Sequence, residues 1–151
     1  MIAVPKKEVH AFCENYVNSR LERIHSEIKK LNEGLQSETK STAGDKHETG
    51  RAMLQLEREK LGKQLLEVEN MKLVMGRISP NQESEKIALG SLVRTDKARY
   101  FISISAGKFR LQNTDVYCIS TSSPIGKILL GKEEGDVILF NGSEQMILGA
   151  R

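Results

Sequence analysis

Tryptophan is absent from this chain, aromatic residues make up only 5% of it, and no long hydrophobic run interrupts its polar sequence. Its apolar runs fall well short of the roughly eighteen residues that a membrane-spanning helix requires. The stretch Met1–Lys7 also lacks the apolar core of a secretory signal peptide. These absences predict a soluble, cytoplasmic protein that has no membrane partner.

Cysteine is scarce, and neither sign of charge is in clear excess. Cys13 and Cys118 are the only cysteines, and their unrelated sequence surroundings favour a reducing compartment over a scaffold held by disulfides. The formal net charge is +3 at pH 7, and basic and acidic residues are balanced in both halves of the chain. This balance argues against a protein that coats nucleic acid, because basic residues would then dominate one segment.

Two long segments carry apolar residues at heptad spacing, the first from about residue 8 to 36 and the second from residue 48 to about 75. Alternating steps of four and three predict a helix that packs along its length on another helix. Arg58 and Lys72 occupy two heptad positions, where long basic side chains can lay their stems along the seam. The stripes consist of Val17, Leu21, Ile24, Ile28, Leu31 and Leu35, and then of Leu54, Leu61, Leu65, Val68 and Met75.

The stretch between these segments, Ser37–Gly50, contains no apolar side chain larger than alanine. Such a stretch cannot join a core, so the first helix should end near Gly34 and the chain should then reverse. The predicted product is an antiparallel helical hairpin within one chain, about 40 Å long at about 1.5 Å per residue. A monomer is therefore expected, with an intermolecular coiled coil as the alternative.

Asp45 and Glu48 lie three residues apart in this turn. This spacing is nearly that of a capping box, in which both side chains bond to backbone N–H groups at the start of a helix. Carboxylate oxygens are also ligands that Mg²⁺ prefers. Spacing alone favours the capping role, and the two roles are compatible because capping uses one oxygen of each carboxylate.

Beyond residue 78 the apolar period changes from seven to two, which is typical of half-buried strands. Asn141-Gly142, between predicted strands at 136–140 and 143–148, is a strong hairpin signal. A short helix is predicted from Ser123 to Gly131 by its capping serine, its proline at the first helical position and its terminal glycine. The other alternating positions are Ile87 and Leu89, and then Tyr100, Ile102 and Ile104.

These patterns predict an α+β fold of two domains. Residues 1–78 form an antiparallel coiled-coil arm with an acidic tip, and residues 79–151 form a small antiparallel sheet packed by one helix.

Two motifs carry a resemblance to a known family. Gly-Asp-x-x-Glu, at Gly44–Glu48, lies at the turn of the helical hairpin, and Ser-Pro-Ile-Gly-Lys-Ile-Leu-Leu-Gly-Lys begins at Ser123. Together they resemble the bacterial Gre transcript-cleavage factors, whose second motif reads Asn-Ser-Pro-Ile-Ala-Arg-Ala-Leu-Leu-Gly-Lys. The resemblance covers nearly the whole chain in architecture, and at the level of residues it is concentrated at Gly44–Glu48 and Thr121–Asp136.

The resemblance implies a transcription elongation factor. Its C-terminal domain would have an FKBP-like fold and would bind RNA polymerase through Ser123, Pro124 and Lys127. Its coiled coil would enter the secondary channel and bring Asp45 and Glu48 close to the 3′ end of the nascent RNA. There the two acids would hold a second Mg²⁺ and so stimulate cleavage of backtracked RNA.

On this interpretation the chain is not an enzyme by itself, because it stimulates the nuclease activity of the polymerase. It binds no cofactor alone and shares Mg²⁺ only in the complex. Two alternatives remain open, namely a channel-binding regulator without cleavage activity and a coiled-coil interaction protein unrelated to polymerase.

Overall fold

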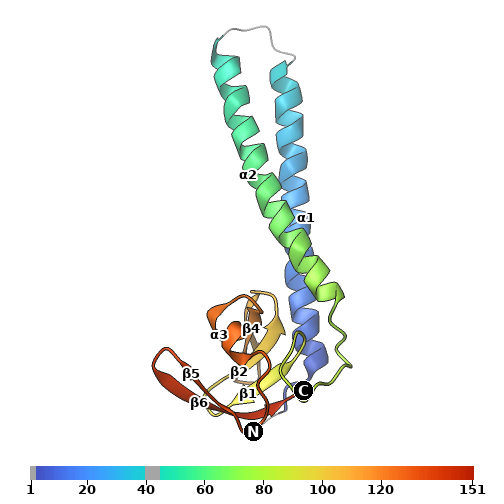
Figure 1. Cartoon of the computed structure of the whole chain (residues 1–151). Coiled ribbons are helices and arrows are strands. Elements are labelled where there is room, and N and C mark those ends of the chain that lie inside the picture. The colour runs from blue at the N-terminus through green and yellow to red at the C-terminus, as the bar shows by residue number, and fades with distance from the viewer. Residues whose placement is uncertain (1–2, 40–44) are drawn as a thin grey trace. The chain divides into compact units, whose positions relative to one another are not determined.

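The structure is a computed structural model that describes residues 3–39 and 45–151, with only the backbone described at residues 38, 39 and 45–48 (Figure 1). Two long helices, α1 (Lys6–Thr39) and α2 (Asp45–Gly76), precede six strands and one short helix, α3 (Pro124–Leu129). The predicted α+β class is confirmed. In the part of the chain that the structure describes, no helix is long and apolar enough to cross a membrane.

Packing divides the chain into two compact units. One unit is the continuous stretch Val17–Lys72, which contains the two-helix arm. The other combines Met1–Tyr16 with Leu73–Arg151, so the first turns of α1 and the last turn of α2 belong with the sheet. The predicted domain boundary at residues 78 and 79 lies within this second unit, which we call the sheet unit.

Within the arm, the two helices lie side by side (Figure 1), and the predicted heptad positions are buried or half-buried apart from Lys72. Ile24 is 1% exposed, Val68 is fully buried, and Arg58 is half-buried at the seam as expected. Lys72 is exposed instead, so its predicted place on the seam is wrong. The neighbouring Met71 is half-buried, because an apolar side chain gains free energy on leaving water whereas a charged one loses it.

Both helices of the arm extend into the polar stretch at residues 37–50. The prediction that the first helix ends near Gly34 is wrong, because α1 continues to Thr39. A Cβ at Gly34 would lie 3.6 Å from the Leu54 Cδ1 atom, which is ordinary van der Waals contact. The two helices therefore pack closely at this level, and that packing favours continuation of the helix over the weak propensity of one glycine.

Gly62, in the interior of α2, offers a test of helix propensity in the arm. A Cβ at this position would meet only the end of the Arg58 side chain, at 3.4 Å. We expect Gly62→Ala to raise the free energy of unfolding by about 1 kcal/mol, because glycine loses more backbone entropy than alanine on folding. Urea denaturation followed by circular dichroism measures the change. An Arg58→Ala background should show a similar gain, whereas a loss in both backgrounds would contradict the prediction.

The sheet unit contains one six-stranded sheet with the strand order β3-β4-β2-β1-β6-β5. The predicted antiparallel sheet is in fact mixed, because β2 and β4 run parallel while the other neighbours run antiparallel. The chain between β2 and β4 forms the edge strand β3, which lets β4 enter the sheet in the direction of β2. The strands are β1 (Leu92–Thr95), β2 (Arg99–Ser103), β3 (Gly107–Leu111), β4 (Thr114–Ser120), β5 (Val137–Phe140) and β6 (Ser143–Ala150).

The strand predicted at Ile87 and Leu89 does not form. The Ile87 N–H donates to the Lys132 carbonyl and the Ile87 carbonyl accepts from the Gly131 N–H, both at 2.8 Å, so this backbone pairs with the end of α3. The chain then turns at Gly90, whose φ of +91° suits glycine. The predicted hairpin turn between β5 and β6 is confirmed, with positive φ at Asn141 and Gly142.

The two faces of the sheet bury different partners, since successive side chains of a strand alternate between faces. One face packs on α3 and forms the main core, which is contributed by Ile87, Val93, Tyr100, Ile102, Ile125, Leu129, Ile138 and Ile147. The other face presents Phe101, Ser103 and Cys118, and the first turns of α1 contact it. The FKBP-like character of this unit stays a prediction.

Candidate functional site

Ser123 begins α3 and ties it to the preceding strand. Its Oγ accepts the Gly126 N–H at 3.1 Å and donates to the Ser120 carbonyl at 2.7 Å. Pro124 follows at the start of the helix, where the backbone needs no N–H donor. The predicted N-terminal cap is thus confirmed, and the Ser123 hydroxyl is fully engaged within the sheet unit.

The outward side of α3 carries the other predicted docking residues. Pro124 and Lys127 are both exposed and lie three residues apart, so they are neighbours on the helix surface. Leu130, immediately after the helix, is 37% exposed. The structure therefore places Pro124 and Lys127 on the exposed side of a helix that Ser123 caps.

The predicted tip acids lie in the first turn of α2, where Asp45 is the first helical residue and Glu48 the fourth. Their side chains lie outside the described part of the structure, as does the whole turn at residues 40–44. The backbone nevertheless sets the two positions one helical turn apart, beside the N–H groups that a helix leaves unpaired at its start. The arrangement allows capping, shared ligation of one cation, or both.

Two carboxylates are too few to hold Mg²⁺ tightly by themselves, since Mg²⁺ takes six ligands. Among the residues with described side chains, no group of three or more His, Cys, Asp or Glu residues could hold a metal ion.

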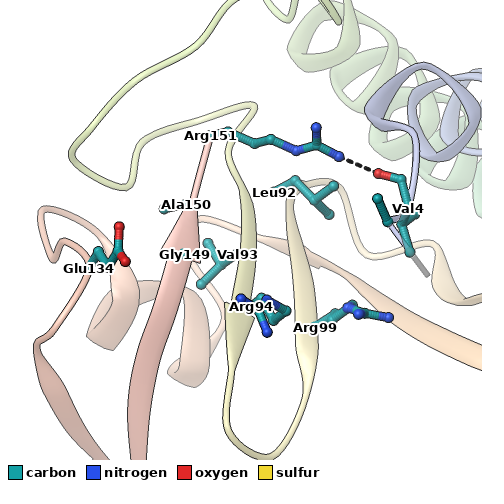
Figure 2. A pocket seen from close by; sticks show the side chains of 10 residues that line it. Val4, Leu92, Val93, Arg94, Arg99, Glu134, Gly149, Ala150 and Arg151 are labelled. Atoms are coloured by element: carbon teal, nitrogen blue, oxygen red, sulfur yellow. Dashed lines mark hydrogen bonds between the residues drawn. The ribbon is translucent and has the colours of Figure 1, made fainter. Parts of the chain in front are cut away.

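A pocket that sequence analysis missed lies in the sheet unit, with a volume of about 520 Å³. Arg94 and Arg99 line it from directly opposite positions on β1 and β2, and Arg151 lines it from beyond β6 (Figure 2). The Arg151 guanidinium donates to the Val4 carbonyl. Two like charges at directly opposite positions destabilise a sheet, so a pair of facing arginines indicates a candidate site. Predicting a hairpin over residues 92–101 would have placed the two arginines opposite each other and so revealed this site from the sequence.

The positive charge around this pocket also affects Lys6. Its Nζ donates to the carbonyls of Gln82 at 2.7 Å and Arg151 at 3.0 Å. Burial, and then the charge of Arg151, hold the pKa of Lys6 below its usual value, while Glu83 acts in the opposite direction. These contacts join the start of α1 to the chain that precedes and follows the sheet.

This chain was compared with protein families, curated proteins and solved structures. No protein-family model matches this chain. No curated protein matches it by sequence. Among solved structures, one described as that of the transcription factor Gfh1 is 21% identical, with 89% of this chain and 90% of that chain covered and a TM-score of 0.36.

Proposed function

We propose that this protein is a transcription elongation factor of the Gre type, which binds RNA polymerase and supplies carboxylates to its active centre. The observation that carries the proposal is that α2 begins at Asp45, which sets both acids of the first motif beside the turn of a two-helix arm. The second motif forms a capped helix in the same chain, with Ser123 as the cap. Capping alone would explain Asp45 and Glu48, but it would not explain why they occur together with the second motif.

The chemistry of phosphodiester hydrolysis suits this role. Two-metal hydrolysis requires one ion near the attacking water and one near the leaving oxygen. Mg²⁺ often keeps several waters and binds few protein carboxylates, so a carboxylate delivered from outside can help retain a second ion. In this proposal Asp45 is the ligand, and Glu48 retains the ion or orients the water. The chain is no enzyme by itself, because the reaction takes place on the polymerase.

The direct test uses purified chain, core RNA polymerase and backtracked elongation complexes. We expect the chain to co-purify with the polymerase and to accelerate RNA cleavage when Mg²⁺ is present. Failure to bind would overturn the whole proposal. Binding without faster cleavage would overturn its catalytic part and leave a regulator that only occupies the channel.

Docking is assigned to the outward side of α3, and a double variant tests it. Pro124→Ala with Lys127→Glu should weaken polymerase affinity about tenfold or more, since a few exposed anchors carry most of the energy of an interface. A pull-down at several polymerase concentrations measures the affinity, and circular dichroism checks that the helices remain.

Lys86→Glu is the matched control, because Lys86 is also an exposed lysine of the sheet unit and lies outside α3. It should leave polymerase affinity unchanged. An unchanged affinity in the folded double variant would place the docking surface elsewhere.

A further inference from the structure

Cys13 and Cys118, which seem unrelated in the sequence, meet inside the sheet unit. Cys13 of α1 is 0% exposed and Cys118 of β4 is 3% exposed. Cys13 lies against Ser103 of β2, and Cys118 lies on the neighbouring strand β4, where each cysteine affects the pKa of the other. The Ser103 Oγ atom lies 3.6 Å from the Cys13 Sγ atom, which is a hydrogen bond at this sulfur. The two thiols therefore form a buried pair with one hydroxyl beside it.

Contacts around the pair fix the first turns of α1 against the sheet. The ring of Phe12, next to Cys13, packs edge-on against Phe109 of β3 with 5.3 Å between the centroids. His10, one turn earlier, has its Nε2 atom 3.2 Å from the Ile78 carbonyl oxygen. Cys118 is held in the parallel register of β2 and β4, opposite Phe101. The two cysteines consequently belong to two anchored elements, α1 and β4.

The surroundings of the two sulfurs are unequal. The hydrogen bond from Cys118 lowers the pKa of Cys13, and the bond from Ser103 adds to this effect against the opposing effect of burial. The pKa of Cys118 is raised, first by its hydrogen bond to Cys13 and then by burial. Cys13 therefore ionises before Cys118, and a thiolate is the reactive form of cysteine.

We propose that Cys13 and Cys118 are a redox-active dithiol, which hydrogen peroxide oxidises to a disulfide between α1 and β4. In the first step the Cys13 thiolate attacks one peroxide oxygen, the O–O bond breaks, and a sulfenic acid forms while the released hydroxide takes up a proton to become water. In the second step the Cys118 sulfur attacks the Cys13 sulfur, the S–O bond breaks, and a second water leaves with the Cys118 proton. Two thiols are oxidised and one peroxide is reduced to two waters.

Burial makes this reaction slow but selective. Hydrogen peroxide is uncharged and little larger than water, so it can reach the sulfurs through brief local openings of the unit. Larger oxidants and a second copy of the chain cannot, which favours the internal disulfide over mixed or intermolecular ones. The site does not depend on polymerase binding and can be tested on the isolated chain.

The first experiment uses the wild-type full chain, reduced, freed of reductant and then exposed to hydrogen peroxide. We expect the intact mass to fall by two hydrogen atoms, peptide mapping to join Cys13 to Cys118, and dithiothreitol to reverse the change. Three results would overturn the proposal: unchanged thiols, a covalent dimer, or a gain of oxygen that dithiothreitol cannot remove.

Single variants test the unequal roles of the two cysteines. In Cys118→Ser, Cys13 should stop at the sulfenic acid and be trapped by dimedone, whereas Cys118 in Cys13→Ser should stay unreacted. Equal labelling of both variants would contradict the assignment of Cys13 as the attacking sulfur. Circular dichroism must show that both variants are folded. The mass measurement on the wild-type chain tests the proposal even if a variant does not fold.

Ser103→Ala tests the hydroxyl beside Cys13 and should slow oxidation severalfold. Ser91→Ala is its control, because Ser91 is a similarly buried serine whose Oγ accepts the Ala88 N–H. It should leave the oxidation rate unchanged. Equal rates in both serine variants would show that Ser103 does not activate Cys13. The oxidised wild type should also have a higher urea midpoint than the reduced one, since the bond closes a loop of about a hundred residues.

Discussion

Asp45→Asn is expected to abolish stimulated RNA cleavage while leaving polymerase binding intact. The amide has nearly the shape of the carboxylate but lacks the negative charge that would hold Mg²⁺. Losing one organised charge from a metal-assisted transition state costs a few kcal/mol, or about a hundredfold or more in rate. Asparagine is also a good N-terminal cap, so the loss would report on charge and not on the start of α2.

Cleavage in backtracked complexes at several Mg²⁺ concentrations measures this effect, and higher Mg²⁺ should restore part of it. Glu48→Gln should have a smaller effect if Glu48 only tunes the ion or the water. Glu38→Gln, near the end of α1, removes the same charge on the other side of the turn and is the control. Full activity in Asp45→Asn and in the double variant with Glu48→Gln would leave these acids as helix caps.

Gly126→Ala is expected to destabilise the sheet unit by about 3 kcal/mol, the upper range for overpacking and the loss of a cap. A Cβ at this position would lie 2.2 Å from the Ser120 carbonyl oxygen and 2.8 Å from the Ser123 Oγ atom. Neither atom can retreat easily, because the first is backbone and the second bonds both to it and to Gly126. The helix α3 would have to move off the sheet and expose Leu129, which is fully buried.

Gly76→Ala is the matched control, because a Cβ at this last residue of α2 would meet nothing within 4 Å. Its unfolding free energy should change by less than about 1 kcal/mol. Urea denaturation of both variants measures the change in unfolding free energy. The dependence of this free energy on urea concentration should be the same in both. Similar midpoints would show that α3 can accept the extra methyl group. The Gre pattern has alanine at the position of Gly126, so this chain departs from the pattern there.

Features with local causes could be predicted from the sequence. Heptad spacing placed Ile24 and Val68 on the buried side of the arm, because the helical period is set by neighbouring residues. The cap of α3 at Ser123 and the turn at Asn141 were predictable for the same reason, since each depends on one or two residues. Their success explains why the motif residues of α3 were correctly placed on a helix.

Features that depend on distant partners could not be predicted. Nothing near Tyr100 or Tyr117 indicates that β2 and β4 run parallel, because strand direction depends on the path of the chain between them. Cys13 and Cys118 were judged unrelated because the contact between α1 and β4 has no local signal. The tip acids differ from both cases, because in the proposed function Asp45 and Glu48 act only on another molecule.

The division of the chain into units bears on how the protein is made. The arm is one continuous stretch, Val17–Lys72, inserted between the two parts of the sheet unit. During synthesis from the N terminus, the arm can form as soon as its two helices have left the ribosome. Cys13 must wait for Ser103 of β2, which is translated after the whole arm. Val9 and Cys13, which are fully buried in the finished sheet unit, therefore stay uncovered until the strands have been made.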